Sequence, residues 1–193
     1  FADCRGLKNV IFGENLTTID NRAFENCYSL SSLSFPQKMS RIGKSAFENC
    51  KNLISIDINN ATLEIGNRAF AKCKLLSNVD LGYNVSSIGQ YAFSYCEQME
   101  SFSIPSSIDS IAKGCFYECI NLRTIDLPDN VKHISSNAFE KCHNITNITI
   151  PNSVISIGER AFAECYALNN LTLSNQLEDI DEYAFFQCYE LET

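Results

Sequence analysis

The chain repeats itself every 23 residues, and this spacing constrains its fold more than any other feature. Phenylalanine recurs in one register without an insertion, and cysteine recurs three residues after it. The phenylalanines are Phe1, Phe24, Phe47, Phe70, Phe93, Phe116, Phe139, Phe162 and Phe185. The cysteines are Cys4, Cys27, Cys50, Cys73, Cys96, Cys119, Cys142, Cys165 and Cys188. A fixed period of this length is typical of a solenoid, in which each unit stacks on the next.

Two further apolar positions share this register. An isoleucine lies five residues before a phenylalanine, as Ile42 does before Phe47, and a small residue directly precedes the phenylalanine. This small residue is alanine except at Cys115. The segment from Ile42 to Cys50 therefore has apolar groups at i, i+4, i+5 and i+8, which predicts a short helical turn.

A second apolar run lies between these anchors. It reads Leu30-x-x-Leu33-x-Phe35-Pro36 in one unit and Ile145-x-x-Ile148-x-Ile150-Pro151 in another. The alternation at its end predicts a short strand with one buried face. Proline lacks an N–H and fixes φ, so it ends the strand. It does so at Pro36, Pro105, Pro128 and Pro151.

The domain expectation is a single solenoid over residues 1–193, with eight 23-residue units and a partial ninth. Parallel strands about 4.8 Å apart would build an arch roughly 40 Å long. Neither end carries the polar capping sequence that terminal repeats normally need. We therefore expect a portion of a longer array, whose uncapped ends allow self-association.

The unit Ile-Pro-x-x-Val-x-x-Ile-Gly-x-x-Ala-Phe-x-x-Cys-x-x-Leu-x-x-Leu, read from Ile150 to Leu171, resembles the BspA-like, or Treponema-type, leucine-rich repeats. The resemblance covers the whole chain. It implies an α/β solenoid: a leucine-rich-repeat arch with a parallel concave β-sheet and short helical or 3-10 turns on the convex side. Proteins of this family are surface or secreted molecules of mucosal bacteria and parasitic protists, used for attachment to host cells, matrix proteins or other microbes.

The outward positions of the predicted strands are mostly small and polar, which suits recognition of a protein or glycan surface. A solvated sheet face without a ligand is the alternative. The candidate ligand-binding residues are Asn9, Ser32, Ser34, Ser55, Asp57, Asn78, Asp80, Ser101, Ser103, Thr124, Asp126, Asn147 and Thr149. Asp57 and Asp80 should be neighbours on adjacent strands, where like charges repel unless a cation such as calcium intervenes.

The cysteines predict buried free thiols. Nine of them occupy one equivalent position, and parallel Cβ vectors in register give poor geometry for a disulfide. Cys115 lies four residues before Cys119 and raises a zinc hypothesis with His133 or His143, but the chain has no C-x-x-C pair. Cys142-His143 is an equally weak nucleophile and base. We therefore expect no metal and no cofactor.

Seven tyrosines lie beside the phenylalanine and cysteine columns, where tyrosine serves either an interface or core packing. Core packing is the favoured interpretation. The tyrosines are Tyr28, Tyr91, Tyr95, Tyr117, Tyr166, Tyr183 and Tyr189. Asn-x-Ser/Thr triplets also occur in mild excess and hint at a secretory route. They begin at Asn15, Asn60, Asn84, Asn144, Asn147 and Asn170.

The net charge of −8 and the pI near 4.8 disfavour nucleic acid and anionic lipid as partners. No apolar stretch approaches the length that inserts into a membrane. The function expected from the resemblance is a non-catalytic, cell-surface or secreted adhesin-type module that binds a protein or glycan on host cells or matrix. The alternative is an intracellular scaffold for protein assembly, for which reduced cysteines and the lack of a signal peptide would be natural.

Overall fold

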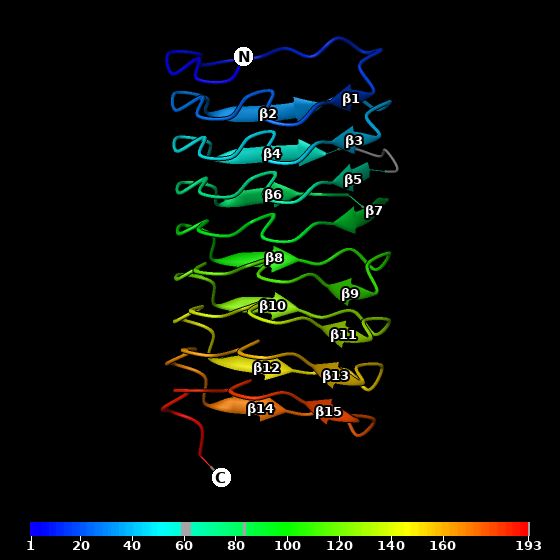
Figure 1. Cartoon of the computed structure of the whole chain (residues 1–193), viewed down its shortest axis with the longest axis vertical. Coiled ribbons are helices and arrows are strands. Elements are labelled where there is room, and N and C mark those ends of the chain that lie inside the picture. The colour runs from blue at the N-terminus through cyan, green and yellow to red at the C-terminus, as the bar shows by residue number, and fades with distance from the viewer. Residues whose placement is uncertain (59–62, 83, 193) are drawn as a thin grey trace.

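The structure, a computed structural model, describes residues 1–58, 63–82 and 84–192. Each unit from Phe24 to Ala184 contributes two strands, and the units stack into two parallel columns (Figure 1). The first strand of a unit, called the long strand, has three or four residues, and the second, called the short strand, has two residues except in β5 and β7. The first unit contributes only a short strand, so the strand predicted around Asn9 is not formed. The long-strand column comprises β2 (Ser32–Phe35), β4 (Ser55–Ile58), β6 (Asn78–Asp80), β8 (Ser101–Ser103), β10 (Thr124–Asp126), β12 (Asn147–Thr149) and β14 (Asn170–Thr172). The short-strand column comprises β1 (Thr18–Ile19), β3 (Arg41–Ile42), β5 (Leu63–Ile65), β7 (Val85–Ile88), β9 (Ser110–Ile111), β11 (His133–Ile134), β13 (Ser156–Ile157) and β15 (Asp179–Ile180).

The long strands are the predicted L-x-x-L-x-L segments, and their prediction is confirmed. They form three parallel sheets, β2-β4-β6, β8-β10 and β12-β14. Paired strands are offset by 23 residues, so that Leu33 lies beside Ile56 and Ile148 beside Leu171. Burial alternates along each strand, because successive side chains point to opposite faces. In β2 the serines are exposed whereas Leu33 and Phe35 are buried.

The short-strand column was not predicted. Its isoleucines were assigned to the start of a helical turn, but Ile42 pairs in parallel register with Ile19 on one side and Ile65 on the other. These three side chains are buried in the core. A strand of two residues is too short to show an alternating pattern in the sequence.

The prediction of helical or 3-10 turns is wrong, because the described residues contain neither type of helix. Two residues before and two residues after each core phenylalanine, the backbone adopts a positive φ between 55° and 65°. Ser45 and Asn49 do so around Phe47. Alternate N–H groups therefore leave the unit: Phe47 N–H donates to Ala69 of the next unit at 2.8 Å, whereas Cys50 N–H donates back to Phe47 at 3.3 Å. A ladder between units replaces the bonds that a helix makes within itself.

The phenylalanines stack through the centre of the solenoid. Neighbouring ring centroids lie 5.1 to 6.1 Å apart, with interplanar angles of at most 11°. From Phe47 to Phe162 the rings are fully buried. One aromatic ladder thus links each unit to the next, as expected for a repeat protein in which each unit contacts only its neighbours.

The ten cysteines are free, as predicted, and all but Cys4 and Cys188 are buried. Each thiol of the column from Cys27 onward donates to the carbonyl of the phenylalanine 26 residues earlier, at 3.1 to 3.5 Å. Burial raises the pKa of Cys50 and of Cys119 to about 12. These side chains act as small core residues that complete the hydrogen bonding of the phenylalanine carbonyls.

Candidate functional site

The outward side chains of the long strands form a continuous polar surface, which we call the long-strand face. It consists of the first and third residues of the long strands. On β6, β8, β10 and β12 these positions are exposed, whereas Ser55 and Asp57 on β4 are half-buried. Twelve of the thirteen predicted residues lie on these strands, and Asn9 is exposed ahead of the first strand.

One hollow of about 470 Å³ gathers six of the predicted residues from β4, β6 and β8. They are Ser55, Asp57, Asn78, Asp80, Ser101 and Ser103. Ser77 and the inward-pointing Ile56, Val79 and Phe102 complete its lining. Hydroxyl, amide and carboxylate groups therefore converge on one concavity from three successive units.

Asp57 and Asp80 are direct neighbours in this hollow, as predicted. Asp80 Oδ1 accepts a hydrogen bond from the Gly82 N–H at 3.0 Å. Asp57 Oδ1 is buried and has no hydrogen-bond partner among the described residues. Among the described residues, no group of three or more His, Cys, Asp or Glu side chains is placed to hold a metal ion. The calcium hypothesis therefore rests on two carboxylates, which supply at most four of the roughly six to eight oxygen ligands that calcium takes.

A second hollow of about 310 Å³ brings together Thr124, Asp126, Asn147 and Thr149. Arg123 and Asp129 also line it, and neither was predicted. Because both charges are present, this hollow differs in chemistry from the acidic one. Asn9, Ser32 and Ser34 line neither hollow.

Two of the predicted glycosylation positions also lie on this face. Asn170 Nδ2 donates to Asn147 Oδ1 at 2.7 Å across β12 and β14. A glycan on either asparagine would cover this part of the surface. Asn60, which begins another triplet, lies outside the described residues.

The cysteines and histidines do not form a reactive site. Cys142 is buried with its thiol on the Phe116 carbonyl at 3.2 Å, and burial raises its pKa well above the ordinary value. His143 instead stacks on Tyr166, with ring centroids 4.6 Å apart. His133 Nδ1 lies 2.8 Å from Ser156 Oγ on the neighbouring short strand. A thiol held as a neutral donor in the core cannot act as a nucleophile.

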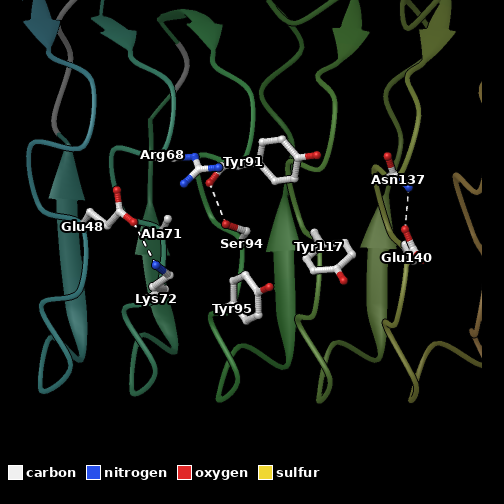
Figure 2. Close-up of a pocket in the computed structure, with 10 residues that line it drawn as sticks. All are labelled: Glu48, Arg68, Ala71, Lys72, Tyr91, Ser94, Tyr95, Tyr117, Asn137 and Glu140. Atoms are coloured by element: carbon white, nitrogen blue, oxygen red, sulfur yellow. Dashed lines mark hydrogen bonds and ion pairs between the residues drawn. The ribbon is translucent and has the colours of Figure 1, made fainter.

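Sequence reasoning missed a pocket of about 430 Å³ among the turns (Figure 2). Tyr91, Tyr95 and Tyr117 line it, each half-buried rather than packed into the core. The usable signal is a change of residue type at repeat positions, such as Gly114 where other units carry a side chain.

Comparison with known proteins agrees with this architecture. A family model described as a BspA type leucine rich repeat region matches residues 1–100 and 86–193. The chain belongs to this family. A leucine rich cell surface protein from Faecalibacterium prausnitzii A2-165 is 35% identical to the chain, with a TM-score of 0.75. That similarity covers 88% of this chain and 46% of the other, so the chain spans about half of that structure.

The leucine rich repeat protein of T. pallidum has the same fold. It is 27% identical, with a TM-score of 0.64, over 92% of this chain and 72% of its own. No curated protein matches the chain significantly. Among the described residues, none belongs to a helix with the length and apolarity needed to cross a membrane. The chain is therefore a BspA-type leucine-rich-repeat protein.

Proposed function

We propose that the chain is an adhesin-type module, on the cell surface or secreted, that binds a protein or glycan of host cells or matrix through the long-strand face. The observation that carries this proposal is the acidic hollow, in which six polar side chains from three units converge, Asp57 and Asp80 among them. A binding surface spread over several units offers many weak contacts at regular spacing, which suits a large ligand.

The family relationship supports the same function. The relative from Faecalibacterium prausnitzii is described as a cell surface protein, and attachment is the role that the sequence resemblance implies. The ligand is therefore expected to be macromolecular and to carry basic or hydrogen-bonding groups that complement Asp57, Asp80 and Asp126.

A second candidate is an intracellular scaffold for protein assembly. The observation that favours it is the column of free thiols, since a reducing compartment keeps such thiols unpaired. Burial protects the same thiols in an oxidising environment, because thiolate formation is suppressed. The column is therefore compatible with a surface location as well.

The test is saturable binding of the purified chain to epithelial cells and immobilised matrix proteins, with and without calcium. Wild type is compared with Asp57→Arg/Asp80→Arg/Asp126→Arg. The control Glu64→Arg/Asp109→Arg/Asp179→Arg makes the same change in net charge on or next to the short strands. We expect the first variant to lose binding and the control to keep it. Absence of binding by folded wild type favours the scaffold, and equal loss in both variants contradicts recognition by the long-strand face.

A further inference from the structure

The turn pocket in Figure 2 is built from positions that the solenoid leaves variable. Its lining residues lie two before, one after or two after a core phenylalanine. Directly after the phenylalanines, Ala71 and Ser94 form a low floor between the larger Glu48 and Tyr117. Both floor residues are only 2% exposed. The pocket therefore exists because two successive units carry a small residue where their neighbours carry a large one.

Tyrosine side chains enclose one end of this floor. Tyr117 makes edge contacts with both Tyr95, at a centroid distance of 5.4 Å, and Tyr91, at 6.3 Å. The three rings come from two adjacent units, and at each of the three positions the neighbouring units on both sides carry a different residue type. Half-buried aromatic rings at one end of a hollow provide flat, weakly polar surfaces with hydroxyl groups at their rims.

Gly114 makes room for this arrangement. A Cβ on Gly114 would lie 2.1 Å from Tyr91 Cε1, so the Tyr91 ring occupies the space where the next unit would place a side chain. The other described units carry arginine, serine, tyrosine or asparagine at this repeat position. All of them have a positive φ there, between 55° and 60°, which favours glycine. Glycine thus appears in the one unit where a side chain would displace a ring of the pocket.

The charges of the pocket leave one cation available. Glu48 pairs with Lys72 at 3.2 Å, and Glu140 pairs with Arg160 at 2.7 Å. Arg68 is exposed and has no carboxylate within ion-pair distance among the described residues; its guanidinium lies 5.5 Å from the Tyr91 ring centroid. A guanidinium has a planar fork of donors that matches a carboxylate. Arg68 therefore gives the pocket a group that can bind the carboxylate of a ligand.

We infer that the turn pocket is a second binding site, distinct from the long-strand face, for a carboxylated sugar residue. Arg68 would hold the carboxylate, while the C–H faces of the sugar ring pack against the electron-rich faces of the tyrosines. Ring hydroxyls would exchange hydrogen bonds with the tyrosine hydroxyls and with Asn137. The volume of about 430 Å³ lies in the ~300–1,000 Å³ range of small-ligand sites.

The test is a titration with methyl glucuronide, its neutral counterpart methyl glucoside, and acetate, followed by tyrosine fluorescence and by NMR of the sugar protons. The chain has no tryptophan, so tyrosine emission is directly observable. We expect saturable binding of the glucuronide with a Kd on the order of 1 mM, and at least about tenfold weaker binding of glucoside and of acetate. Methyl N-acetylneuraminate, a second carboxylated sugar, determines which ring the pocket prefers.

Matched variants locate the site. Arg68→Met should weaken glucuronide binding about tenfold or more, whereas Arg22→Met, at the same repeat position two units away, should leave it unchanged. Tyr95→Leu should weaken binding, and Tyr189→Leu, on an exposed tyrosine, should not. Circular dichroism confirms that each variant is folded. Failure of folded wild type to bind either carboxylated sugar, equal binding of glucoside, or full binding by Arg68→Met would overturn the inference. None of these outcomes depends on the long-strand face.

Discussion

A cysteine recurs in every unit because its position requires a small apolar side chain that can still donate one hydrogen bond. The thiol of Cys119 donates to the Phe93 carbonyl at 3.1 Å and is completely buried. We predict that iodoacetamide labels only Cys4 rapidly and Cys188 slowly in the native protein, and all ten thiols in denaturant. Mass spectrometry of digested samples measures the sites. Labelling of Cys119 as fast as Cys4, or a disulfide within the column, would show that the packing is different.

The same burial makes stability sensitive to alkaline pH. The pKa of Cys50 and Cys119 rises from the ordinary 9.0 to about 12 in the folded state, so the unfolded chain loses these protons first. Stability is therefore retained below pH 9 and lost as pH rises from 9 toward 12, by about 1.4 kcal/mol per pH unit for each thiol. Urea unfolding between pH 7.5 and 10.5 tests this dependence. A free energy of unfolding that stays constant above pH 9 would contradict it.

The two classes of element differ in how far the sequence predicts them. The long strands were predicted because their alternation is visible in runs such as Ile148-Thr149-Ile150. The turns were not, since apolar groups at i, i+4, i+5 and i+8 fit two successive tight turns as well as a helix. Arg68 and Lys72 adopt a left-handed backbone conformation, although arginine and lysine do not favour it. At these residues, hydrogen bonds between units hold this conformation.

The left-handed backbone of the turns should tolerate glycine but not a β-branched residue at the same position. Lys72 has a φ of 61°, and its backbone N–H donates to the Ser94 carbonyl at 2.7 Å. Both Lys72→Gly and Lys72→Val remove the ion pair with Glu48, so their difference reports the backbone alone. We expect the valine variant to be less stable than the glycine variant by about 1–2 kcal/mol, because a β-branched residue is strained in this region. Chemical denaturation measures it, and equal or reversed stabilities would argue for a helical turn.

For the molecule as a whole, each unit contacts only its neighbours, and the stacked phenylalanines are part of every one of these contacts. Phe93 is fully buried between Phe70 and Phe116, whereas Phe1 is 74% exposed. Phe93→Ala should lower the free energy of unfolding by about 3–5 kcal/mol, and hydrogen exchange should then show the two halves opening separately. Phe1→Ala should change stability by less than about 0.5 kcal/mol. Similar costs at both positions would contradict a nearest-neighbour solenoid.

The sequence predicts the long-strand face but not the turn pocket, and the difference follows from the repeat. Strand alternation placed Asp57 beside Asp80 correctly, because register follows from the 23-residue period. The turn pocket was missed because its tyrosines are brought together by the left-handed turns and by the absence of a side chain at Gly114. Repetition predicts which residues build the core and the long-strand face, whereas the turn pocket arises at positions where the repetition is broken.

Strand β8 allows the most direct test, since inward and outward residues alternate within three positions. Phe102 is buried, and Ser101 and Ser103 are exposed in the acidic hollow. The measurement is the Kd of Ser101→Arg/Ser103→Arg for the captured cell or matrix ligand, taken beside its free energy of unfolding. We predict at least about tenfold weaker binding with stability within roughly 0.5 kcal/mol of wild type per substitution. Unchanged affinity in this folded variant would show that the ligand does not occupy the long-strand face.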